Sequence, residues 1–95
     1  MISPMPKGSL RVLVPDHVVV RDLAGEALLV HLDNGVYFGL DAVGTRIWHL
    51  LAEHGSPEAV VPHLLREFDV DEAQLRCDLD ALVAQLLEKG LLVAA

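Results

Sequence analysis

Residues 27–41 have the sequence Ala-Leu-Leu-Val-His-Leu-Asp-Asn-Gly-Val-Tyr-Phe-Gly-Leu-Asp, and this stretch decides the fold. Two short apolar runs, 27–32 and 36–40, flank the step Asn34-Gly35. An Asn-Gly step favours a tight hairpin because both residues accept positive φ. Asp41 then suits the N-cap of a helix, because its side chain can accept a backbone hydrogen bond from the first turn. The sequence therefore predicts two antiparallel strands that lead directly into a helix.

Further elements lie on both sides of this stretch. A β-branched run at residues 18–20 precedes it, and Ala24-Gly25 separates the two, which predicts a third strand. Beyond the strands the apolar period changes to about 3.6 residues, the period of helices. We expect one helix that ends before Gly55, one that starts at Ser56-Pro57, and one over about 72–88. The predicted fold is α+β: a three-stranded antiparallel meander followed by three helices.

The third predicted helix has the clearest boundaries. Asp71 suits its N-cap, Gln74 lies at the capping-box position, and Gly90 suits the C′ position. The second helix contains Pro62, which has no backbone N–H. We expect this helix either to kink at the proline or to become regular only from about Val61.

The composition indicates one small domain. The 95 residues are 53% hydrophobic and 4% aromatic, too few for two cores but apolar enough for one built from Leu, Val and Ala. Residues 1–16 hold three of the five prolines, so we expect a flexible or partly extended arm there, in which only 10–14 could pair as a strand. Residues 17–95 are expected to form the folded domain.

The charge balance argues against nucleic acid as a partner. Seven Lys and Arg residues stand against fourteen Asp and Glu residues, giving a net charge of −7, and the basic residues are spread singly. Phosphate backbones are bound by clustered basic residues. No stretch approaches the roughly 18 apolar residues of a membrane-spanning helix, and Pro4 and Pro6 interrupt the region where a signal peptide would be apolar. We expect a cytoplasmic protein with no nucleic-acid and no membrane partner.

The sequence contains no convincing catalytic or metal-binding pattern. Five histidines are present, but no two have the i, i+4 spacing of a zinc pair on one helix. The single cysteine, Cys77, cannot form an internal disulfide and is expected to be inert. We therefore expect no catalytic residue, no metal and no cofactor.

A peptide-binding groove is the strongest candidate site. A three-stranded meander has two free edges, and one of them, 36–40, leads into the helices. Gly39 lies within this strand and indicates either a close approach of another backbone or a tight fit under a helix. If the wide apolar flank of the helix 72–88 lies beside that edge, strand and helix form two walls that suit an extended peptide.

The chain resembles the PqqD-like family. The resemblance is carried by the stretch Gly35-Val36-Tyr37-Phe38-Gly39-Leu40-Asp41-Ala42-Val43-Gly44-Thr45-Arg46-Ile47-Trp48-His49-Leu50-Leu51, with Asp78-Leu79 and the ending Lys89-Gly90-Leu91-Leu92, and it covers about 18–93. It implies a winged helix-turn-helix-like fold that serves as a RiPP recognition element, a non-catalytic protein that binds the leader of a ribosomally made precursor peptide. The branch that serves pyrroloquinoline quinone synthesis has a Pro-Glu-Gly segment before its third strand, whereas this chain has Leu32-Asp33-Asn34-Gly35. The resemblance therefore favours the stand-alone proteins of lasso-peptide pathways.

In that family the leader adds as a strand to the third strand and packs against the third helix. Carried over by position, the peptide-binding residues are Val36, Tyr37, Phe38, Gly39 and Leu40 on the strand, and Arg76, Leu79, Asp80, Val83 and Leu87 on the helix. Strand alternation puts Val36, Phe38 and Leu40 on one face, expected to be inward, and leaves Tyr37 exposed. On this assignment, Val83→Asp is expected to abolish binding while the fold is retained.

The resemblance also implies partners. These are the precursor leader peptide and a leader peptidase and cyclase, or another RiPP maturation enzyme. Two alternatives belong to other classes: a small adaptor that docks a partner enzyme, and a winged-helix regulator that binds DNA. The second is opposed by charge, because the helix 72–88 has Arg76 as its one basic residue and carries Glu72, Asp78 and Asp80.

Overall fold

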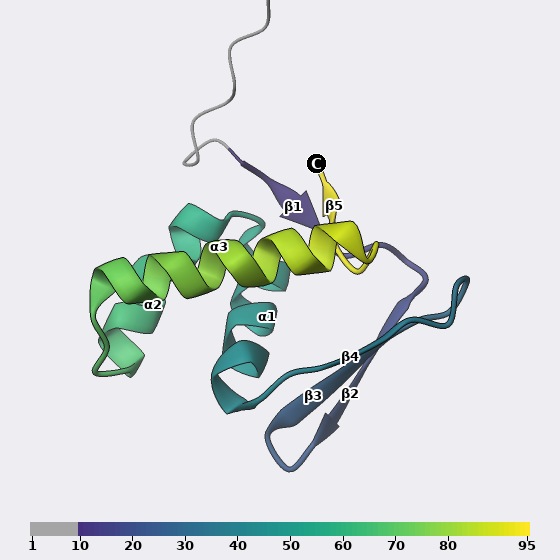
Figure 1. Ribbon diagram of the computed structural model, residues 1–95, viewed down its shortest axis with the longest axis horizontal. Helices are drawn as coiled ribbons and strands as arrows, with labels where there is room; N and C mark the ends of the chain where they lie inside the picture. Colours follow the sequence, from purple (N-terminus) through teal and green to yellow (C-terminus); the bar gives the residue numbers. More distant parts are fainter. Residues whose placement is uncertain (1–9) are drawn as a thin grey trace, which may run out of the picture.

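Three antiparallel strands form the main sheet, in the order β2-β3-β4. They are β2 (Val18–Leu23), β3 (Glu26–His31) and β4 (Tyr37–Gly39) in the computed structural model, in which residues 10–95 are described. Three helices follow, so the predicted α+β fold with a meander before three helices is confirmed (Figure 1).

The two hairpin turns differ from the prediction in their backbone. Ala24 and Gly25 both have positive φ, 54° and 85°, which is the signature of a two-residue type I′ turn. In the other turn Gly35 alone of the Asn34-Gly35 pair has positive φ, 73°. His31 N–H donates to the carbonyl of Val36, and Gly35 N–H donates to the carbonyl of His31, so four residues form the loop. The hairpin was predicted correctly, but the tight turn lies at the other end of β3.

The three helices begin and end close to the predicted residues. They are α1 (Ala42–His54), α2 (Pro57–Glu67) and α3 (Glu72–Glu88). The Asp41 carboxylate accepts a hydrogen bond from Gly44 N–H, and Gly55 ends α1 with φ 70°. The Asp71 carboxylate accepts from Gln74 N–H, although the Gln74 side chain donates to Asp78 and does not close a capping box.

Two helix features needed the structure to settle them. Helix α2 starts at Pro57 and continues through Pro62. After α3, Gly90 has φ 74°, and the Gly90 and Leu91 N–H groups donate to the carbonyls of Leu87 and Leu86. This is a Schellman ending, which turns the chain sharply back along the end of α3.

A second, two-stranded sheet joins the two ends of the described chain. Strand β1 (Val12–Leu13) pairs with β5 (Val93–Ala94) in antiparallel register. Val12 is buried in the core, and its N–H donates to the carbonyl of Gly55. The sequence allowed a strand within 10–14, but it gave no sign that this strand would pair with residues 93–94. The remainder of the predicted arm, residues 1–9, lies outside the described residues.

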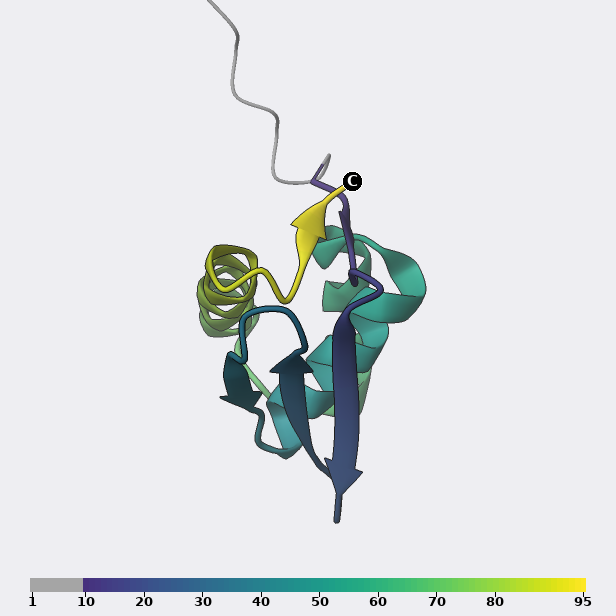
Figure 2. The ribbon, with the colours of Figure 1, turned by 90° about the vertical axis from the view of Figure 1, so that its right-hand side faces the viewer.

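Helix α3 and strand β4 lie next to each other at one side of the molecule. In Figure 2, where α3 is seen end-on, β4 is the strand nearest to it and β2 lies at the far edge of the sheet. The core between sheet and helices is built around Trp48 with Leu and Val side chains from every helix. Within residues 10–95, no helix is long and apolar enough to cross a membrane.

An ion pair links the first two helices at the surface. The Arg46 guanidinium of α1 donates two hydrogen bonds to the Glu67 carboxylate of α2, at 2.6 and 2.8 Å. These bonds hold the pKa of Glu67 below its ordinary value of 4.5. The pair is exposed, so it contributes little to stability and is weakened by salt.

Candidate peptide-binding cleft

Within residues 10–95, no strand pairs with the outer edge of β4. Leu40 N–H donates to the Ala27 carbonyl at 2.8 Å, so the backbone groups of Leu40 face β3. In an antiparallel pair the residues alternate between facing the partner strand and facing away from it. Tyr37 and Gly39 therefore direct their N–H and C=O groups away from β3. Since β4 is the last strand of the sheet, these four groups can pair with an added strand.

The side chains of this strand alternate as predicted. Tyr37 is 69% exposed, whereas Val36 and Phe38 are partly buried against the core and Leu40 is buried. The five predicted strand residues thus lie together at one edge, with the inward face fixed by the core. Their predicted contact with a peptide stays a prediction.

An apolar cleft lies between this edge and α3, and we name it the β4–α3 cleft. Its volume is about 340 Å³. It is contributed by β4, by the first half of α1 and by the middle of α3. The lining residues are Phe38, Gly39, Leu40, Asp41, Val43, Gly44, Ile47, Asp78 and Leu82. The free edge and an apolar surface for side chains are therefore adjacent, as strand addition requires.

Gly39 is not required by the packing of the protein itself. A Cβ atom built on Gly39 meets no atom of the described part of the chain within 4 Å, and the φ of Gly39 is outside the left-handed region. The predicted alternative of a tight fit under a helix is therefore wrong. The open space beside Gly39 is consistent with the other alternative, close approach of a second backbone.

The five predicted helix residues lie on a different surface of α3. Arg76, Leu79, Asp80, Val83 and Leu87 line a groove of about 290 Å³ between α2 and α3, which Leu10, Pro57, Glu58, Val61 and Ala84 complete. We name it the α2–α3 groove. None of these five residues lines the β4–α3 cleft. The structure therefore does not bring the predicted strand and helix residues together, and a contact of these five with a peptide stays a prediction.

Burial explains this placement. Leu79 and Val83 are only 2% and 4% exposed, so they belong to the core between the helices. Arg76 is held at the rim by the Glu58 and Glu72 carboxylates, at 2.9 and 3.0 Å. The hydrogen bond from Arg76 lowers the pKa of Glu58 below its ordinary value. The expectation that Val83→Asp leaves the fold intact is therefore wrong, since it would bury a carboxylate.

Sequence reasoning missed the α3 residues that do face β4. Asp78 and Leu82 line the cleft from α3, and Val43 and Ile47 line it from α1. Asp78 and Leu82 are four residues apart and share one helix face. The sequence gave little indication of this helix face because it combines an apolar and a charged residue: Leu82 is partly buried and Asp78 is exposed.

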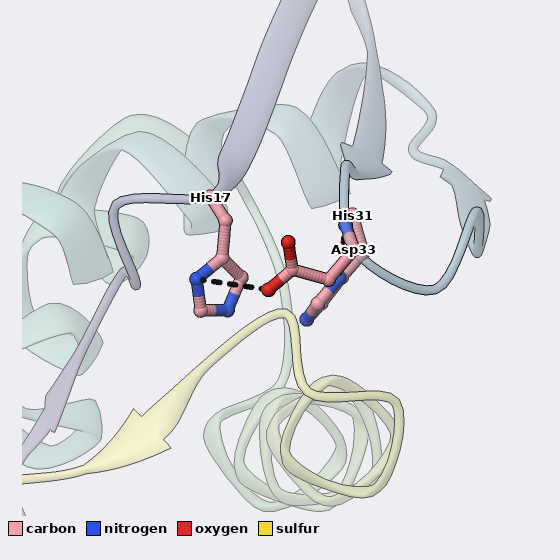
Figure 3. A group of neighbouring side chains, drawn as sticks. All are labelled: His17, His31 and Asp33. Atoms are coloured by element: carbon pink, nitrogen blue, oxygen red, sulfur yellow. Dashed lines mark hydrogen bonds and ion pairs between the residues drawn. The ribbon is translucent and has the colours of Figure 1, made fainter.

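Two histidines and an aspartate form a cluster beside the turn that leads into β4 (Figure 3). The rings of His17 and His31 are 4.5 Å apart, and His17 Nδ1 is 3.6 Å from the Asp33 carboxylate. His31 Nδ1 accepts hydrogen bonds from the backbone N–H groups of Asp33 and Asn34, at 3.2 and 3.3 Å. A neutral His31 that accepts at Nδ1 carries its proton on Nε2, which leaves that nitrogen without a lone pair for a metal. The geometry therefore indicates that His31 stabilises the turn before β4 by accepting these two hydrogen bonds.

The fold and the site define a class of protein: a small domain with an open strand edge beside an apolar cleft, which suits an extended peptide. The chain belongs to the PqqD family, since residues 26–92 match coenzyme PQQ synthesis protein D (PqqD). The resemblance inferred from the sequence is thereby confirmed.

Two solved structures share this fold. One is TbiB1 in complex with the TbiA(beta) leader peptide, with 43% sequence identity and a TM-score of 0.77, over 83% of this chain and 92% of that chain. The other is lasso peptide synthetase B1 complexed with the leader peptide, with 24% identity and a TM-score of 0.77, over 87% of this chain and 98% of that chain. No curated protein matches the chain.

Proposed function

We propose that this protein binds the leader of a ribosomally made precursor peptide, as an added strand on β4, and presents it to maturation enzymes. The observation that carries the proposal is the unpaired edge of Tyr37 and Gly39 beside the β4–α3 cleft. A relative with 43% identity was solved in complex with a leader peptide, which supports the same role here. The role is recognition without catalysis, in the cytoplasm.

The energetics assign separate tasks to the edge and the cleft. Tyr37 and Gly39 offer two N–H and two C=O groups, and hydrogen bonds contribute about 1 kcal/mol net each, or ~4 kcal/mol together. A micromolar complex requires about 8 kcal/mol, and association entropy opposes binding further. Side chains of the leader must therefore bury in the cleft, so sequence selectivity resides there.

A lasso-peptide pathway is the proposed context. A structure of the same fold is a lasso peptide synthetase B1 with its leader peptide, and the turn before β4 lacks the Pro-Glu-Gly segment of the quinone branch. The enzyme partners would then be a leader peptidase and a cyclase. The DNA-binding alternative has no support, since the comparisons are with leader-peptide complexes and the net charge is −7.

The test is a titration of the fluorescently labelled leader of the short precursor encoded nearest this gene, read by anisotropy. A scrambled leader of the same composition is the control. Micromolar or tighter binding of the true leader alone supports the proposal. If a protein shown to be folded binds neither peptide, the proposal fails. A pull-down of the maturation enzymes without the precursor would then favour an adaptor.

A further inference from the structure

The lining of the β4–α3 cleft includes two carboxylates. Asp41 and Asp78 lie on its lining, and both are exposed. Their orientations are fixed, because one Asp41 oxygen accepts from Gly44 N–H at 2.7 Å and one Asp78 oxygen accepts from the Gln74 side chain at 2.9 Å. Among the described residues, no Lys or Arg lines this cleft.

A positive charge lies further along the same helix face. Strand β4 and helix α3 run in opposite directions (Figure 1). Lys89 is the C-cap of α3 and Asp78 lies in the middle of that helix, so along the helix Lys89 is nearer to the start of β4 than Asp78 is. The Lys89 ammonium is 6.0 Å from the centre of the Phe38 ring. Lys89 follows Asp78 by eleven residues, which is about 16 Å along a helix and about five residues of an extended chain.

We propose that the leader segment held by this cleft combines an apolar anchor residue with a Lys or Arg that lies between Asp41 and Asp78, within about two residues of the anchor, because Asp78 and Leu82 are only about 6 Å apart along the helix. The anchor packs among Phe38, Val43 and Leu82, which line the cleft; Phe38 and Leu82 are partly buried and Val43 is exposed. This inference rests on the proposed function, because the unpaired edge of β4 is what places a peptide here.

The chemical reason is desolvation. A peptide that covers the cleft removes water from both carboxylates, and an uncompensated charge is costly to bury. A leader with an apolar or acidic residue beside these carboxylates would therefore lose part of the affinity gained from the anchor. A guanidinium or ammonium placed there supplies the missing partner and discriminates against other peptides.

The experiment uses the full-length protein and the same labelled leader. Each Lys or Arg of the leader is replaced singly by Gln, and each peptide is titrated against the wild type and against Asp78→Asn. Asp16→Asn is the matched control, since it changes the net charge equally but lies in the turn before β2, at the far edge of the sheet. Circular dichroism checks that each variant is folded.

We expect one replacement to weaken binding to the wild type by about three- to tenfold, the range of a partly covered ion pair. That peptide should bind Asp78→Asn and the wild type about equally, while Asp16→Asn behaves as the wild type. A leader with Glu at this position should regain affinity for Asp78→Lys. If every replacement changes the affinity for the wild type and for Asp78→Asn by the same factor, the inference is wrong and the proposed function still stands. Absence of binding by the unmodified leader overturns both.

Discussion

Replacing Gly39 by proline removes one hydrogen-bond donor that the fold of the protein does not use. The Gly39 N–H points away from β3, because Gly39 pairs with Leu28 at a position that is not hydrogen-bonded. Proline is tolerated on edge strands for this reason. No atom of residues 10–95 lies within 4 Å of a Cβ added at Gly39, and its φ is outside the positive range, so the fold does not require glycine at this position. We therefore expect Gly39→Pro to fold.

The expected loss of affinity follows from the missing donor. One net hydrogen bond contributes about 1 kcal/mol, and a leader carbonyl left unpaired in the complex adds about 1 to 2 kcal/mol. The sum of about 2 to 3 kcal/mol corresponds to a Kd raised roughly 30- to 150-fold. Gly39→Ala is the matched control, because it adds a Cβ atom but keeps the N–H; any loss that it shows measures the contact of this Cβ with the peptide, and the difference in Kd between the two variants measures the donor.

Anisotropy titration of the labelled leader measures both variants, and thermal unfolding checks their stability. The reasoning predicts that the two variants have similar Tm values and very different Kd values. A folded Gly39→Pro that binds the leader as tightly as Gly39→Ala would show that β4 does not receive the peptide as a strand. A Gly39→Pro that fails to fold would contradict the backbone directions assigned to this edge.

Three further predictions concern stability. His31→Phe should lower the free energy of unfolding by about 1 to 2 kcal/mol, or Tm by roughly 5 to 15 °C, because two backbone N–H groups lose their acceptor. His17→Phe is the control, and equal effects of the two substitutions would show that these hydrogen bonds do not stabilise the turn. Arg46 lowers the pKa of Glu67 in the folded protein, so on acidification Glu67 takes up its proton first in the unfolded state. This ion pair therefore stabilises the fold above pH 4.5, and its contribution is lost as the pH falls further. Glu67→Gln should reduce the fall in Tm on acidification at low salt, and an unchanged fall would contradict the assignment. Val83→Asp should lower the free energy of unfolding by at least ~3 kcal/mol, measured by urea unfolding, because Val83 is buried. A free energy of unfolding like that of the wild type would place Val83 at the surface.

Local sequence signals sufficed for most of the fold. Caps at Asp41 and Asp71 and stops at Gly55 and Gly90 lie where the residue types require them, because capping depends on neighbours in the chain. The pairing of β1 with β5 is different. It joins strands at opposite ends of the chain, and two short runs of Val, Leu and Ala carry no signal for a partner so far away.

The candidate site likewise has one side that local sequence signals predict and one side that they do not. The strand edge could be predicted because the meander order and the alternation at Tyr37 and Phe38 are local properties. The helix side could not, because an apolar stripe shows that a face is buried without showing what buries it. The stripe with Leu79 and Val83 packs into the core between the helices and lines the α2–α3 groove, so the apolar flank of α3 and the strand edge lie on different surfaces.

A face that binds a peptide reversibly must be soluble in the free protein and apolar enough to hold the peptide. The face of α3 towards β4 meets both demands, because Asp78, Leu82, Gln85 and Lys89 share it by their spacing of three or four residues. One partly buried leucine supplies apolar contact, and the exposed polar residues keep the face hydrated when the cleft is empty. In the proposed function, selectivity depends on a single anchor position together with the charges on either side of it, and the backbone edge of β4 contributes affinity that any extended peptide could use.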